Sequence, residues 1–236
     1  MSTTRLSKHA SAGAFVLAAT LGMGTVFIVP AQAAVVAAAP TATTTTVTVA
    51  SATVAYGETA RATVSVDTAT NGGPKPAGKV ELRVGDKILV ADLDNSGKVT
   101  FDLPLVGAST TPYAVTATFT PTDPLAFSPS TAAPASVTVT KDATTSTVTA
   151  RHKVTQRKIV AKNVVTSKNG QVPTGKVRFV LRRNGLKIAK SVVSLNTAGV
   201  ARAKFLNVRK TGTYKVIAVY RGSANFLPSK GSFKIV

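Results

Sequence analysis

The sequence contains no cysteine and no tryptophan, and it has nine acidic side chains against 29 lysines and arginines over 236 residues. Without cysteine the chain has no disulfide framework, no thiolate nucleophile, no Cys-ligated metal and no cysteine that could carry a lipid anchor. Its stability must therefore come from packing. Both methionines lie within the first 23 positions, and Thr, Val, Ala and Ser dominate the rest. That composition is typical of half-buried strands, so we expect almost no helix.

The N-terminus has the three parts of a secretory signal. Arg5 and Lys8 precede an apolar stretch over residues 12–29, and Ala31-Gln32-Ala33 then supplies the small-x-small pattern that signal peptidase accepts. We predict a signal peptide over residues 1–33, and hence a secreted or cell-surface protein. The alternative is an uncleaved membrane anchor, because the apolar stretch is about long enough to span a bilayer.

After the signal segment the chain repeats itself at a spacing near one hundred residues. Pro76-Ala77-Gly78-Lys79-Val80 returns as Pro173-Thr174-Gly175-Lys176-Val177. A stretch without charge precedes the first copy and is typical of a low-complexity linker. The predicted division is a linker over residues 34–46, a first repeat over 47–140 and a second repeat over 141–236.

Apolar residues within each repeat alternate with period two, in runs of five to nine separated by Gly, Asn, Asp and Pro. In the run from Val177 to Arg182, the apolar side chains point one way and the basic ones the other. Asn184-Gly185 follows this run and suits a tight hairpin whose two central residues both need positive φ, and Gly85-Asp86 has the matching place in the first repeat. About seven such strands per repeat predict an all-β fold of two tandem two-sheet sandwiches.

The chain resembles the bacterial Ig-like repeat domains of exported surface proteins. The resemblance rests on Pro-x-Gly-Lys-Val, on the run from Gly212 to Gly222, and on Ala224-Asn225-Phe226-Leu227-Pro228-Ser229 before the last strand. It implies immunoglobulin-like β-sandwiches in a modular protein, and it implies no particular ligand. Tyr113 and Tyr214 stand where such a sandwich places a tyrosine whose hydroxyl bonds back to the backbone.

Charge divides the two repeats sharply. Residues 41–140 contain six Lys or Arg and eight Asp or Glu, whereas residues 141–236 contain twenty-one Lys or Arg and the single acid Asp142. Self-repulsion of that size destabilises a compact domain, so folding does not account for it. We therefore expect a ligand with regular negative charge.

The predicted partners are an anionic cell-wall polymer or another extracellular acidic polymer, together with DNA bound non-specifically and through its charge alone. The simpler alternative is a solvated basic surface that keeps strand edges from pairing with other molecules. The candidate contacts are basic residues expected on the wet faces of the strands of the second repeat: Arg178, Arg182, Arg183, Arg202, Lys204, Lys215, Arg221, Arg151, Lys153, Arg157, Lys158 and Lys162.

Two features of the sequence could indicate a catalytic or metal site. His152 is the only histidine after residue 33, and no acid near it could orient it as a general base, so we expect an exposed strand residue. The run from Asp92 to Gly97 resembles the opening of a calcium loop, but Leu103 occupies the place of the bidentate glutamate. A hairpin with an Asx turn explains the same residues. We predict no catalytic residue, metal, cofactor or small-molecule substrate.

Three functions follow in order of preference. The first is a non-enzymatic interaction protein in which the first repeat is a spacer and the second binds anionic polymers non-covalently. The second is an adhesin or structural spacer that binds another surface protein. The third, an enzyme, requires a site hidden among the acids of the first repeat, which are Glu58, Asp67, Glu81, Asp86, Asp92, Asp94, Asp102 and Asp123.

The signal segment generates the first testable prediction. Because the small-x-small pattern ends at residue 33, the secreted chain should begin at Ala34. Intact-mass spectrometry of the secreted protein would check this. A mass that retains residues 1–33 would support the membrane-anchor alternative.

Overall fold

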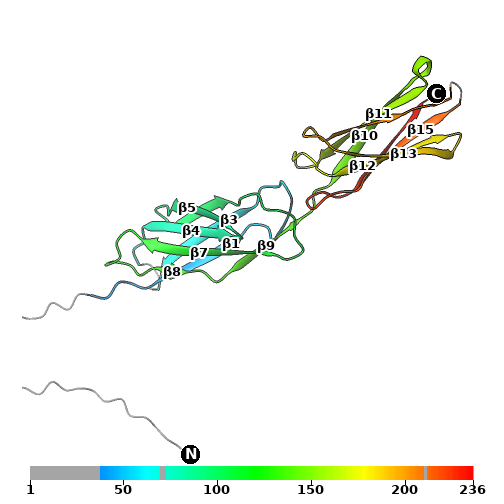
Figure 1. The fold of residues 1–236 in the computed structure, drawn as a ribbon. Helices are drawn as coiled ribbons and strands as arrows, with labels where there is room; N and C mark the ends of the chain where they lie inside the picture. Colours follow the sequence, from blue (N-terminus) through cyan, green and yellow to red (C-terminus); the bar gives the residue numbers. More distant parts are fainter. Residues whose placement is uncertain (1–37, 70–72, 210–211, 236) are drawn as a thin grey trace, which may run out of the picture. The chain divides into compact units, whose positions relative to one another are not determined.

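A computed structural model describes residues 38–69, 73–209 and 212–235. The predicted signal peptide and the first four residues of the predicted linker, 34–37, lie outside these residues. The described chain is all β, as predicted, apart from one 3-10 turn, η1 (Val154–Gln156). Figure 1 shows the strands of the first repeat in blue to green and those of the second in green to red. No helix in the described ranges is long and apolar enough to cross a bilayer.

The strands of the first repeat form two sheets, of order β1-β3-β6 and β2-β9-β7-β4-β5, with the short β8 paired to β7. All pairs are antiparallel except β2 with β9. The strands are β1 (Thr43–Val49), β2 (Thr53–Ala55), β3 (Arg61–Thr68), β4 (Gly78–Val84), β5 (Lys87–Asp92), β6 (Lys98–Asp102), β7 (Tyr113–Pro121), β8 (Ser130–Thr131) and β9 (Ala135–Thr140).

The second repeat also forms two sheets, of order β10-β11-β14 and β13-β12-β15-β16, and both are entirely antiparallel. Its strands are β10 (Thr144–Lys153), β11 (Lys158–Ser167), β12 (Lys176–Arg183), β13 (Leu186–Ser194), β14 (Val200–Phe205), β15 (Tyr214–Tyr220) and β16 (Ser229–Ile235).

Each repeat buries one hydrophobic cluster between its two sheets. In the second repeat Ile159 and Ala161 of β11 lie in one cluster with Phe179 and Leu181 of β12, all at most 1% exposed. These residues alternate with exposed ones because successive side chains of a strand point to opposite faces. The period-two pattern therefore decides which side chains form the core and which form the two outer faces.

The predicted hairpin forms between β12 and β13. Arg183 pairs with Leu186, and the two residues between them, Asn184 and Gly185, have φ of 46° and 84°. In the first repeat Gly85 has φ of 59° in the two-residue connection from β4 to β5. Positive φ at both central residues is what a type I′ turn requires, so the prediction for Asn184-Gly185 is confirmed.

Two glycines show that the repeats are copies of one fold. A Cβ placed on Gly97 would lie 2.6 Å from the carbonyl oxygen of Val66, and one placed on Gly199 would lie 2.6 Å from that of Val165. Both glycines have positive φ. Gly97 directly precedes the first residue of β6, and Gly199 directly precedes the first residue of β14. Val66 thus corresponds to Val165, and Gly97 to Gly199, which allows the two outer faces to be compared position by position.

The two tyrosines also occupy matching places. The Tyr113 hydroxyl donates to the carbonyl of Gly107 over 2.9 Å, and the Tyr214 hydroxyl donates to that of Arg209 over 3.0 Å. Each bond ties the first residue of a strand, β7 or β15, to the connection that precedes it. The expected structural role of both tyrosines is confirmed.

Two expectations differ from the structure. The linker was expected to run to Thr46, but β1 begins at Thr43, because residues 43–46 already pair through their backbone with residues 65–68 of β3. Thr45 is buried there and shares a 2.7 Å hydrogen bond with the Ser130 hydroxyl. Seven strands were expected per repeat, and the first repeat has nine because the short β2 and β8 attach to β9 and β7.

The turn glycines predict a graded loss of stability. Gly199→Ala should lower the free energy of unfolding by roughly 3 kcal/mol, because the new Cβ meets both a left-handed backbone and a carbonyl oxygen. Gly185→Ala is the matched control: its φ is also positive, but no atom lies within 4 Å, so about 1–2 kcal/mol is expected. Urea denaturation of residues 34–236 would measure both. Equal losses would contradict the close approach at Gly199.

Candidate functional site

The acids of the first repeat mostly neutralise its own bases. Five ion pairs are seen in the described ranges, all with exposed partners and all within residues 61–102. Such pairs contribute little to stability, but they leave the outer faces of the first repeat close to neutral. The pairs are Arg61–Asp102, Lys75–Asp67, Lys79–Asp92, Arg83–Glu81 and Lys87–Asp86.

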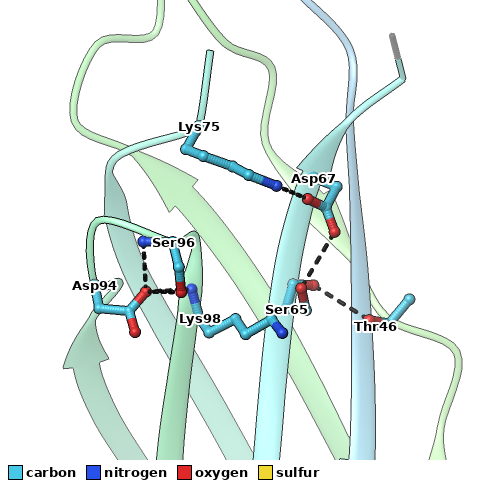
Figure 2. Close-up of polar contacts among 7 residues, drawn as sticks. All are labelled: Thr46, Ser65, Asp67, Lys75, Asp94, Ser96 and Lys98. Atoms are coloured by element: carbon cyan, nitrogen blue, oxygen red, sulfur yellow. Dashed lines mark hydrogen bonds and ion pairs between the residues drawn. The ribbon is translucent and has the colours of Figure 1, made fainter. Parts of the chain in front are cut away.

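The remaining acids of the first repeat close turns. Glu58 accepts a hydrogen bond from the backbone N–H of Ala55, and Asp123 accepts from that of Leu125. Asp94 Oδ1 accepts from the backbone N–H groups of Ser96 and Lys98, both at 2.8 Å (Figure 2). This is the predicted Asx turn.

The second repeat makes the same turn without a charge. Asn196 Oδ1 accepts from the backbone N–H groups of Ala198 at 3.0 Å and Val200 at 2.9 Å. The turn therefore needs an oxygen acceptor and not a carboxylate. Within the described residues no three His, Cys, Asp or Glu side chains gather as a metal site would require.

The only acid of the second repeat is withdrawn from its surface. Asp142 is 0% exposed, and its Oδ2 accepts a hydrogen bond from the backbone N–H of Asn169 at 3.0 Å. No hydrogen-bond partner for Asp142 Oδ1 lies among the described residues. No aspartate or glutamate is thus available to neutralise the twenty-one bases of this repeat.

A row of four cations crosses the sheet β13-β12-β15-β16. Arg182 lies opposite Lys187 on one side and Lys215 on the other, and Lys215 lies opposite Lys234. All four are exposed. Neighbouring strands are about 4.8 Å apart, so four positive charges are attached along roughly 14 Å of sheet. Like charges directly opposite each other destabilise a sheet.

The rest of this face is also basic. Arg178 and Lys176 lie on β12, Lys190 on β13 and Lys230 on β16, and all four are exposed. We call the outer face of β13-β12-β15-β16 the row face. The Pro-x-Gly-Lys-Val match aligns Arg178 with Glu81, so at this position the first repeat has the opposite charge, whereas Lys176 aligns with Lys79.

The outer face of β10-β11-β14 is the second basic surface. Lys162 lies opposite Arg202, and the next pair on this side of the same strands is Val160 opposite Lys204; Val160 and Lys162 are half-buried, and Arg202 and Lys204 are exposed. We call this surface the groove face, because a groove of about 560 Å³ lies on it. The groove is lined by Thr149, Ala150, Arg151, Lys153, Val160, Lys162 and Arg202, and by Phe233 of β16.

The first repeat has neutral pairs where the groove face has charge. The glycine correspondence aligns Lys162 and Arg202 with Thr63 and Thr100, whose hydroxyls share a 3.2 Å hydrogen bond. One step along, Lys204 aligns with Asp102, which forms an ion pair with Arg61. The same fold therefore forms these strands without any surplus of positive charge.

The predicted contact residues divide between the two faces. Arg178, Arg182 and Lys215 lie on the row face, and Arg151, Lys162, Arg202 and Lys204 lie on the groove face with Lys153 and Lys158 at its end. The structure thus gives two surfaces and not one. Lys187, Lys190, Lys230 and Lys234 were not among the predicted contacts, because only the strand register brings them beside the others.

Three predicted contacts lie outside the row face and the groove face. Arg157 forms the left-handed turn after η1, with φ of 45°, and was wrongly placed on a strand. Arg221 follows the end of β15 at Tyr220. Arg183 ends β12, and its guanidinium carbon lies 6.0 Å from the ring centre of Tyr214, which is a cation–π distance.

His152 lies on strand β10, as predicted, but it was wrongly expected to be exposed. The ring is half-buried and meets Tyr214 edge-on, with 5.3 Å between the ring centres. Its Nε2 is buried and has no hydrogen-bond partner within the described ranges. The side chain points toward the core side of the strand because it alternates with the exposed Arg151 and Lys153.

The acids predict a difference in acid sensitivity between the repeats. Hydrogen bonds from Ser96 and the Lys98 backbone lower the pKa of Asp94, and the bond from Lys75 lowers that of Asp67. A lowered folded-state pKa contributes stability above the ordinary value of 3.8, and this is lost as the pH falls through the folded-state value. The first repeat should therefore lose protection at acid pH before the second.

Hydrogen exchange followed by mass spectrometry would test this, because it reads peptides of each repeat separately. Asp94→Asn should weaken the acid dependence of the first repeat, since Asn196 shows that an amide oxygen can make the same turn. The matched change Asn196→Asp should introduce acid dependence into the second repeat. An unchanged pH profile in both variants would contradict the role given to Asp94.

The comparisons with known proteins concern the second repeat and the fold. Residues 142–236 match the family described as bacterial Ig-like domain (group 3). No curated protein matches the sequence.

Among solved structures, one with 16% identity is the tetra-tandem repeat in the extending region of a large adhesion protein, with 83% of this chain covered and a TM-score of 0.43. A second is the adhesin InvE of Yersinia pseudotuberculosis, with 13% identity over 81% of this chain and a TM-score of 0.38. A third is a two-domain fibronectin type III segment of chicken tenascin, with 12% identity over 80% of this chain and a TM-score of 0.39. This chain spans 50% of the first structure, 58% of the second and 96% of the third. The match over residues 142–236 confirms the expected resemblance to bacterial Ig-like domains, and it concerns this part of the chain.

Proposed function

We propose that the chain is an exported, non-enzymatic modular surface protein whose second repeat binds anionic polymers, a cell-wall polymer or an acidic polysaccharide, without a covalent bond. In this proposal the two repeats are separate domains, over residues 47–140 and 141–236. The separate hydrophobic clusters support that division. The family match and the predicted signal peptide support a place outside the cell.

The observation that carries the proposal is the row of four cations across β13-β12-β15-β16. Its members face like charges on neighbouring strands, which costs stability that the fold itself does not demand. A ligand with several negative charges in a line would offset this cost, because it would lie between the cations and release their counterions. A single small anion would engage only part of the row.

The first repeat supports the proposal by contrast. Its outer faces carry ion pairs and paired hydroxyls at positions where the second repeat carries cations without an acidic partner. It is therefore suited to act as a spacer that does not compete for the polymer. Its acids form ion pairs and close turns, and we propose that they take no part in catalysis.

The row gives the proposal a sharp test. Arg182→Gln, Lys215→Gln and Lys234→Gln together should weaken binding of residues 34–236 to immobilised polygalacturonate and to linear polyphosphate. On duplex DNA the same variant should reduce the slope of log K against log salt by about 2–3, because each phosphate contact contributes roughly 0.9. Fluorescence anisotropy across a salt series would measure both effects.

The matched control removes three cations of the first repeat: Lys79→Gln, Arg83→Gln and Lys87→Gln. These side chains are engaged with acids, so polymer binding should change little. A chain that ends at Thr140 should not bind at all. If residues 34–236 bind none of the three polymers at low salt, the proposal fails and a protein-binding or spacer role becomes the better interpretation.

A further inference from the structure

Strong positive charge covers both outer faces of the second repeat. We infer that this repeat is bivalent: the row face and the groove face bind separate anionic polysaccharide chains, so that one protein molecule cross-links two polymer chains. The inference rests on the proposed function, but it adds a second binding surface and a different outcome of binding.

The groove face carries like-charge pairs of its own. Lys162 faces Arg202 across β11 and β14, and Lys153 faces Lys158 across β10 and β11. A domain that attached to a polymer through the row face alone would gain nothing from these pairs. It would still bear their cost, because opposed like charges destabilise a sheet wherever they stand.

The first repeat shows that the cost is avoidable. At the positions of Lys162 and Arg202 it has Thr63 and Thr100, which hydrogen-bond to each other. The cations of the groove face are thus a property of this repeat and not of the fold. A binding role on each face accounts for both sets of unfavourable pairs.

The two faces point away from each other. The hydrophobic cluster that contains Ile159 and Ala161 of β11, and Phe179 and Leu181 of β12, fills the space between the sheets. Because the exposed residues alternate with these core residues, the cations on the two sheets leave the sandwich on opposite sides. A straight polymer segment lying on the row face cannot contact the groove face.

The groove face also offers a contact that the row lacks. Phe233, 37% exposed, and Val160 line the groove together with Arg151, Lys162 and Arg202. An aromatic ring beside cations fits a sugar ring that carries an acid group, since the apolar side of the sugar packs on the ring while the acid meets the cations. This favours an acidic polysaccharide over a polymer without rings.

A sandwich assay separates binding from cross-linking. Residues 34–236 are bound to immobilised polygalacturonate at low salt, the surface is washed, and fluorescent polygalacturonate is added. Captured fluorescence per bound protein reports a second chain held by the same molecule. Light scattering of the free protein must show a monomer, because self-association would also capture a second chain.

Three variants of equal net charge locate the two surfaces. The row-face variant changes Arg182, Lys187, Lys215 and Lys234 to Gln, and the groove-face variant changes Arg151 and Lys204 to Gln and Lys162 and Arg202 to Thr. The mixed variant changes Arg182 and Lys187 to Gln and Lys162 and Arg202 to Thr. All the changed side chains lie on the outer faces, and Arg182 also donates a hydrogen bond to the Gly185 carbonyl, so urea denaturation of each variant must show that its stability is kept.

The expected result depends on whether the four lost cations come from one face or are shared between the two. Each single-face variant should stay on the immobilised polymer but lose about tenfold or more in captured fluorescence, because one of two linked binding events is gone. The mixed variant, with the same net charge, should stay within about threefold of the unmodified chain.

Three results overturn the inference. Capture that is equal in all three variants would show that net charge alone controls it. Binding without any capture by the unmodified chain would show that one polymer occupies the protein, including the case of a chain that wraps around the β16 edge; the proposed function would survive this result. Absence of binding to the immobilised polymer would overturn both this inference and the proposed function.

Discussion

Cross-strand pairing of side chains is the constraint on which the electrostatics of both repeats depend. A side chain on an outer face has its nearest neighbour about 5 Å away on the next strand, and that neighbour decides whether its charge is compensated. In the first repeat Arg61 meets Asp102 and Lys79 meets Asp92. In the second, Arg182 meets Lys187 and Lys215, and Lys162 meets Arg202. One fold thus supports two surfaces of different character through the choice of partner at equivalent positions.

The features that hold each sandwich together are separate from this choice. The tyrosine hydroxyls bond to backbone carbonyls, and Gly97 and Gly199 allow the close approach of a neighbouring strand. Asp94 and Asn196 close the same turn with and without a charge. Because these elements work with backbone atoms and small side chains, the outer faces could change sign without change in the fold.

The sequence predicted the fold well because its evidence is local. Period-two alternation placed Arg178 on a wet face and Phe179 in the core, and Asn184-Gly185 marked its hairpin. The site was harder to predict, because it depends on register. A register shift between Leu181 and Arg182 sets which lysine of β13 faces Arg182, and no local pattern reveals it. Arg157 was misplaced for a related reason: the turn at η1 interrupts what the alternation presents as continuous strand.

The direction of the cation row has a mechanical consequence. The row runs across the strands, with one cation attached to each of β13, β12, β15 and β16. A polymer that follows it lies perpendicular to the strands, so tension on the polymer is divided among four strands that are hydrogen-bonded to one another. In the proposed complex no single strand would bear the whole load of a polymer that is pulled along its own length.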